Sequence, residues 1–268
     1  MGRRLSHYLN QPSHSCSTAA PTTPAQLMAC VRPGDVLLVE GTTRVAVAIK
    51  YLTQSTWSHA ALYVGAATGA FDEGGQIRCF VEADIEQGVR AVSVSEFTGY
   101  HCRVCRPVGL STDEVDRVIR FVVDRLGQQY DLQNVVDLAR YLLPTPPVPV
   151  RWRRRMLALG SGDPTRAICS TLIAQAFQVV RYPILPIINA VSTDDPQCPG
   201  CVAEILRVRH HSLFVPRDFD VSPYFEIVKP TLHAGFNHRA LDWEDDGNLV
   251  SGRLSMAATG MAEARMSA

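Results

Sequence analysis

Two residues far apart in the sequence, Cys169 and His59, have the types and surroundings that thiol chemistry requires. Cys169 opens an apolar run that is predicted to be helical, so the thiol stands at the start of a helix. His59 directly precedes the apolar run 60–64, so the imidazole stands where a buried strand begins. A thiol attacks a carbonyl at neutral pH only when its pKa is lowered and a base accepts its proton. A helix N-terminus lowers a thiol pKa, and an imidazole can hold the proton.

The other cysteines admit a second interpretation, because two pairs have the CxxC spacing of zinc ligands. Cys102 and Cys105 fall inside a predicted strand, which is poor geometry for a zinc knuckle, whereas Cys198 and Cys201 flank Pro-Gly in a loop. Shared zinc coordination would make the protein a zinc-binding interaction protein. Unligated core thiols are the alternative, as is a local redox or loop role for the second pair. We expect no bound metal and no organic cofactor.

The composition is that of an ordinary globular protein. The chain has 268 residues, of which 46% are apolar and 19% charged, and its formal net charge is zero. The lack of a basic excess argues against a dedicated nucleic-acid binder. No apolar run reaches the roughly 18 to 20 residues that cross a bilayer, and polar residues follow Arg3 and Arg4 where a secretory signal needs an apolar stretch. We therefore predict a cytoplasmic protein.

Periodicity and turn residues predict strands joined by short connections, which is typical of an antiparallel meander, together with several helices. Strands are predicted at 36–39, 60–65, 78–84, 89–94, 101–107 and 213–215. Helices are predicted at 24–30, 43–52, 111–126, 132–143 and 168–180, the third of them opened by a Ser-Thr-Asp-Glu capping box. A loop-rich region is expected between the last helix and Pro196. One domain over residues 24–244 is predicted, with a Pro- and Arg-rich insertion near 144–160, a polar segment at 1–23 and a disordered tail at 245–268.

This order of elements, with the histidine strand ahead of the cysteine helix, resembles the circularly permuted papain-like cysteine hydrolases, specifically the YiiX/YebB-like group of the NlpC-type superfamily. The resemblance covers roughly residues 30–230. It is carried by the segments 32–39, 49–60, 63–65, 80–83, 130–131, 169–173, 215–219 and 222–223.

The resemblance implies a permuted papain-like α+β fold, in which an antiparallel, partly barrel-like sheet packs against a helix headed by the cysteine. It implies Cys169 as nucleophile, His59 as general base and Glu82 as the group that orients the imidazole. The activity would be that of a thiol-dependent hydrolase or acyltransferase that forms an acyl-enzyme from an amide or ester, on lipid or peptide-type substrates. A catalytically inert lipid- or peptide-binding domain of the same fold is the alternative.

The residues around Glu82 agree with that role. A carboxylate among apolar neighbours needs a hydrogen-bond partner, and an imidazole N–H could donate to it. This hydrogen bond would in turn fix the tautomer of the imidazole. Asp84 is the rival, because strand side chains two residues apart share a face.

Three further residues are candidates for lining the substrate site: Tyr130, Ser58 and Ser170. Backbone N–H groups at the start of the cysteine helix are the expected oxyanion donors.

A basic run in the insertion is the remaining anomaly. It holds four arginines and a tryptophan, which would contact anionic lipid headgroups or a phosphate near the cleft, or lie solvated in a loop. We expect peripheral contact with a membrane surface through Arg151, Trp152, Arg153, Arg154 and Arg155.

Overall fold

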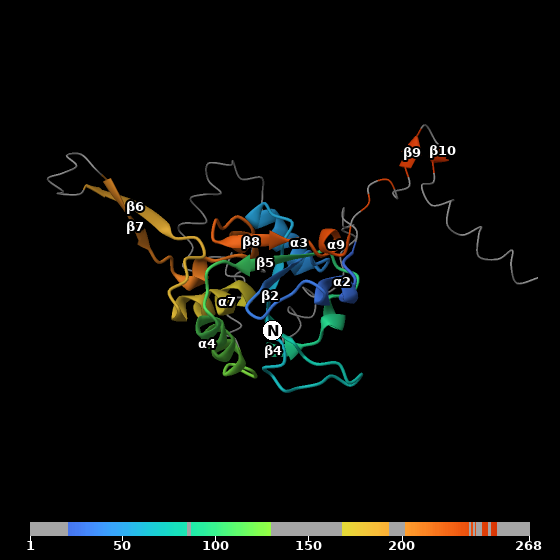
Figure 1. The fold of residues 1–268 in the computed structure, drawn as a ribbon, viewed down its shortest axis with the longest axis horizontal. Helices are drawn as coiled ribbons and strands as arrows, with labels where there is room; N and C mark the ends of the chain where they lie inside the picture. Colours follow the sequence, from blue (N-terminus) through green and yellow to red (C-terminus); the bar gives the residue numbers. More distant parts are fainter. Residues whose placement is uncertain are drawn as a thin grey trace, which may run out of the picture.

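The centre of the fold is a six-stranded antiparallel sheet (Figure 1). The computed structural model describes residues 21–84, 87–129, 168–192 and 202–235, together with 237, 239, 243–245 and 248–250. In spatial order the strands are β4 (Gly88–Val92), β3 (Phe80–Asp84), β2 (His59–Tyr63), β1 (Val36–Val39), β5 (Cys102–Pro107) and β8 (Phe225–Val228).

The mixture of helices and an antiparallel sheet confirms the predicted α+β class. The sheet is open, because β4 and β8 form its two edges and do not pair with each other in the described part of the chain. The predicted barrel-like closure is therefore not found there.

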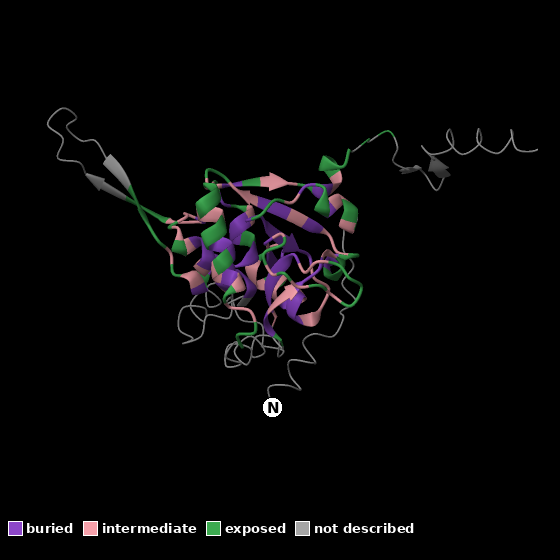
Figure 2. Cartoon of the chain, turned by 60° about the horizontal axis from the view of Figure 1, so that its bottom comes forward, coloured by how far each residue is buried: buried purple, intermediate pink, exposed green. Residues whose placement is uncertain are grey.

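Alternate residues of the strands feed two apolar cores on opposite faces of the sheet, as the two-residue period of a strand requires. Val36 and Leu38 of β1 join one core, and Leu37 and Val39 join the other. The first core holds α7 (Ile168–Val179), which packs against β2 and β3 and against α4 (Thr112–Val123). The second core lies under α2 (Pro24–Met28) and the 3₁₀-helix η1 (Val94–Phe97). Buried residues accordingly fill the centre of the molecule in Figure 2.

Local sequence explains why α4 begins where it does. Ser111 accepts a hydrogen bond from the backbone N–H of Glu114, and the Glu114 side chain accepts one from the backbone N–H of Ser111. This reciprocal pair satisfies donors that the first helical turn leaves open. Val118, Ile119 and Val122 then bury one face of the helix.

A close backbone contact fixes β4. The N–H of Val89 donates to the carbonyl oxygen of Gln128, and the N–H of Gly127 donates to that of Val89. Gly88 has φ +74°, and a Cβ at this position would collide with the carbonyl oxygen of Gln128. Only glycine meets both conditions without strain.

Two sequence predictions are wrong in the C-terminal half. Residues 213–215 do not form a strand, because the chain turns through the 3₁₀-helix η2 (His211–Leu213) and enters α8 (Pro216–Asp220). Part of the expected loop-rich region is instead an antiparallel ribbon of β6 (Ile187–Ser192) and β7 (Val202–Arg207), which projects from the body in Figure 1. Within the described residues, the two strands of the ribbon pair with each other and not with the central sheet.

The remaining elements lie around the sheet. They are α3 (Arg44–Thr53), α9 (Pro230–His233), β9 (Trp243–Asp245) and β10 (Asn248–Val250). The predicted helix at 132–143 lies outside the described residues. Within the described ranges, no helix has the length and apolar character needed to cross a membrane.

Candidate active site

Cys169 is the second residue of α7, as the sequence predicts, and is 4% exposed. Its thiol accepts a hydrogen bond from the backbone N–H of Ala60, and its Sγ lies 3.9 Å from the hydroxyl oxygen of Ser170. The packing of α7 against β2 and β3 brings this end of the helix to the start of β2. The thiol therefore meets the strand that carries His59.

His59 lies between the thiol and a carboxylate. Its Nε2 is 2.7 Å from Oε2 of Glu82, and its side chain also hydrogen-bonds to Cys169. Because Nε2 is engaged by Glu82, the nitrogen left for the thiol is Nδ1. The side chain of His59 is 29% exposed and that of Glu82 only 4%, so solvent reaches the site from the imidazole side.

The register of the sheet explains how the thiol reaches a strand. The pairing of β2 with β3 begins at Ala61 and Glu82 and continues to Tyr63 and Phe80. Ala60 lies one residue before this ladder, and its N–H donates to Cys169 instead. The helix end thus takes the place of a strand partner where β2 and β3 stop pairing.

Glu82 has a second partner that the sequence analysis missed. Arg90 lies directly opposite it in the β3–β4 register. The Nε and Nη2 of Arg90 lie 2.9 Å and 2.6 Å from Oε1 of Glu82, and Nη2 also donates to Glu96 at 2.8 Å. One oxygen of the carboxylate therefore contacts Arg90 and the other contacts His59.

These contacts shift the pKa values in the directions that an ion pair requires. Burial opposes ionisation of Cys169, but the charge and hydrogen bond of His59 outweigh it and hold the pKa of the thiol below its usual value. Burial likewise disfavours the imidazolium, yet the Cys169 thiolate and Glu82 raise the pKa of His59 well above its usual value. Burial of Glu82 is outweighed by His59 and Arg90, which lower the pKa of its carboxyl. A thiolate–imidazolium pair is the state that this environment favours.

Four other thiols in the described part of the chain have the opposite character. Burial raises the pKa of Cys102 to about 12, and burial also raises the pKa values of Cys30, Cys79 and Cys105. Cys102 and Cys105 point into different cores on opposite faces of the sheet, so they do not form a knuckle that shares one metal. The described residues contain no group of three or more potential metal ligands. Cys198 and Cys201 lie outside them.

The remaining candidates from the sequence are placed differently. Asp84 is at the end of β3, where its Oδ1 accepts from the N–H of Gln87, so the structure places Glu82 and not Asp84 beside His59. Ser58 is buried, and its hydroxyl accepts from the N–H of Gly41.

Ser170 is fully buried next to the thiol. Tyr130 and the basic run Arg151, Trp152, Arg153, Arg154 and Arg155 lie outside the described residues.

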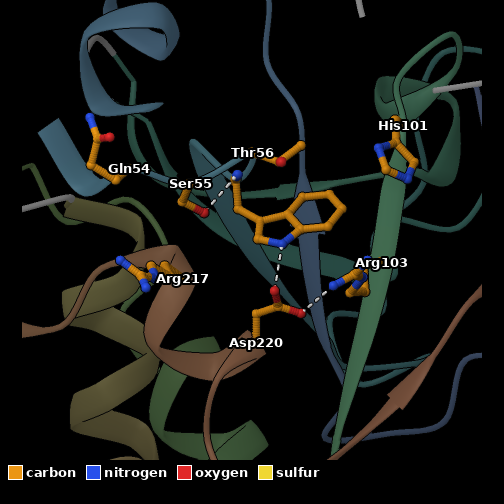
Figure 3. Close-up of a pocket in the computed structure, with 8 residues that line it drawn as sticks. Gln54, Ser55, Thr56, His101, Arg103, Arg217 and Asp220 are labelled. Atoms are coloured by element: carbon orange, nitrogen blue, oxygen red, sulfur yellow. Dashed lines mark hydrogen bonds and ion pairs between the residues drawn. The ribbon is translucent and has the colours of Figure 1, made fainter. Parts of the chain in front are cut away.

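An open polar pocket of about 390 Å³ lies beside the segment that leads into β2 (Figure 3). Trp57 forms one wall, where its indole N–H donates to Asp220 at 3.1 Å and the guanidinium of Arg103 lies 4.9 Å from its ring centroid. Asp220 also accepts from Arg103 at 2.6 Å. These contacts fix Trp57, two residues before His59, and the sequence analysis did not single them out. Gln54, Ser55, Thr56, His101 and Arg217 complete the lining.

Residues 30–141 match a family described as the permuted papain-like amidase enzyme, YaeF/YiiX, C92 family. This match confirms the resemblance that the sequence suggested, over a stretch that contains His59, Glu82 and Arg90. Cys169 lies beyond the matched stretch, so its place beside His59 rests on the fold. No curated protein matches the chain.

Proposed function

We propose that the protein is a cysteine hydrolase or acyltransferase in which Cys169, His59 and Glu82 act together on an amide or ester. The observation that carries the proposal is the chain of contacts from the thiol through the imidazole to a buried carboxylate. The family match supports a papain-like amidase at the coarser level.

The proposed reaction follows from the positions of these groups. The thiolate of Cys169 attacks the carbonyl carbon, and the imidazolium of His59 gives its proton to the leaving amine or alcohol as the bond to it breaks. Neutral His59 then takes a proton from water or another acyl acceptor as its oxygen or nitrogen attacks the thioester, which releases the acyl product and restores the Cys169 thiolate beside the His59 imidazolium. Backbone N–H groups at the start of α7 are the proposed donors to the oxyanion. Glu82 holds the imidazole in one tautomer throughout.

Limited alkylation tests the identity of the nucleophile. We expect iodoacetamide at pH 6.5 to label Cys169 before any other thiol, because its pKa is lowered while burial raises those of Cys79, Cys102 and Cys105. Peptide mapping after partial reaction measures the order of labelling, and the Cys169→Ala variant controls for background. Earlier labelling of another thiol would remove the main support for the proposal and favour a binding domain without catalysis.

The pH dependence gives a second test. Activity requires the thiolate of Cys169 and the imidazolium of His59 at the same time. Since the thiol pKa is lowered and the imidazole pKa is raised, we expect a bell-shaped profile of kcat/KM. Its acid limb should lie below the usual range of a thiol, and its alkaline limb above the usual range of a histidine; both limbs describe the pair together. A profile that rises only above the pKa of a free thiol would contradict the ion pair.

A further inference from the structure

We propose that Arg90 is a positioning residue of this site, which holds one oxygen of Glu82 so that the other stays directed at His59. The inference rests on the proposed function, because a positioning role has meaning only if His59 works with Cys169. Arg90 itself makes no contact with the thiol or the imidazole among the described residues.

The geometry separates the two oxygens of the carboxylate. Both contacts from Arg90 reach Oε1, at 2.9 Å from Nε and 2.6 Å from Nη2, while Oε2 lies 2.7 Å from Nε2 of His59. Rotation of the Glu82 carboxyl group would break one of these interactions. A carboxylate held at one oxygen in this way presents a fixed acceptor to the imidazole.

The permanent charge of Arg90 affects the ionisation of Glu82, because His59 loses its own charge during the proposed reaction. Glu82 is a buried carboxylate, with a side chain only 4% exposed, and the charged groups that contact it in the described structure are His59 and Arg90. When His59 gives up its proton, an isolated buried Glu82 would tend to take one up. A guanidinium stays protonated throughout. Arg90 therefore keeps Glu82 ionised when His59 is neutral, so that Nε2 retains its proton and Nδ1 remains the base.

Arg90 is itself fixed from two directions. It stands opposite Glu82 across the β3–β4 ladder, and β4 is held on its other side by the hydrogen bonds between Val89 and the segment 127–128. Its Nη2 also donates to Glu96, whose side chain is 48% exposed. Of the two carboxylates that Arg90 contacts, Glu96 lies at the surface and Glu82 lies in the buried site. Substitution at Glu96 is therefore a matched control that removes only the outer partner.

The experiment measures the rate at which iodoacetamide alkylates Cys169 as a function of pH, which needs no substrate. In Arg90→Met we expect the rate at pH 6 to fall by at least about tenfold and the acid limb to move to higher pH, because the imidazolium loses an ordered, ionised partner. Arg90→Lys keeps the charge and should restore most of the rate. Glu96→Gln should remain within about twofold of the wild type. Far-UV circular dichroism and thermal unfolding verify that each variant is folded.

A double variant keeps the inference testable if Arg90→Met is unstable. Arg90→Gln also removes the charge and should slow alkylation in the wild-type background, but in the Glu82→Gln background the carboxylate is already gone, so adding Arg90→Gln should change the alkylation profile by less than about twofold. Equal losses from Arg90→Gln in both backgrounds would overturn the inference, as would a wild-type profile in Arg90→Met or an equal loss in Glu96→Gln. Failure of the proposed function looks different, because Cys169 of the wild type would then show no reactivity at acid pH.

Discussion

Replacement of His59 by alanine is expected to reduce turnover by about 100- to 10,000-fold, because it removes the group that accepts and returns the proton. The same change removes the imidazolium that holds the pKa of Cys169 down, so alkylation of the thiol at pH 6.5 should fall with it. The fold should survive, since the side chain of His59 is 29% exposed at the first position of β2. Measurements of kcat/KM and of the alkylation rate check both effects.

His101 provides a matched control. It is also a half-buried histidine beside a carboxylate, with Nδ1 3.3 Å from Oε2 of Glu40 and a side chain 23% exposed. His101 lines the polar pocket, next to the ends of β1 and β5. No hydrogen bond or ion pair joins it to Cys169 in the described structure. His101→Ala should therefore leave the alkylation rate of Cys169 close to that of the wild type. If His101→Ala were the more damaging change, the base would have to be reassigned.

Replacement of Glu82 by glutamine is expected to reduce activity by about 10- to 100-fold, which is less than the loss of His59. A hydrogen bond to a charged group contributes about 1.5 to 3 kcal/mol, and the variant loses this stabilisation of the imidazolium, which corresponds to the expected loss of rate. The amide keeps the size of the side chain but presents its N–H₂ or its weaker oxygen to His59, so the wrong tautomer becomes accessible. The kcat/KM of the variant, measured where the wild type is most active, checks the size of the loss.

Asp84→Asn is the control for that variant. Asp84 has the same charge, lies two residues further along β3 and accepts from the N–H of Gln87 instead of contacting His59. We expect its replacement to change activity by less than about twofold, because Asp84 is only partly buried at the end of β3 and its carboxylate bonds to Gln87, away from the imidazole. A larger loss in Asp84→Asn than in Glu82→Gln would show that the orienting group is misassigned.

Much of the candidate site could be predicted from the sequence because its three members stand at the beginnings or centres of strongly patterned elements. The apolar runs after His59 and Cys169 fix β2 and α7, and the carboxylate of Glu82 interrupts an otherwise apolar strand. A charged side chain in such a strand indicates a partner, since its burial alone would be costly.

Other parts could not be predicted because they depend on register or on distant pairing. Arg90 becomes the partner of Glu82 only when the turn before Gly88 aligns the two strands, and a shift of one residue would place it on the other face. The contact of Trp57 with Asp220 joins residues that are 163 positions apart. The β6–β7 ribbon was missed because the apolar residues described in it do not enter a core: Ile188 and Leu206, which face each other across the two strands, are 56% and 45% exposed.

The backbone N–H of Ala60 has a practical consequence for anyone who wishes to capture a bound substrate with an inactivated protein. An alanine in place of Cys169 removes the acceptor to which Ala60 donates, and a serine displaces it, because the bond to the serine oxygen is shorter than the bond to sulfur. A buried donor without a partner costs about 1 to 3 kcal/mol. The usual inert substitutions would thus loosen the start of β2, the strand that positions the imidazole. Inactivation at His59 leaves the sulfur in place to receive this bond, and is the better choice for trapping.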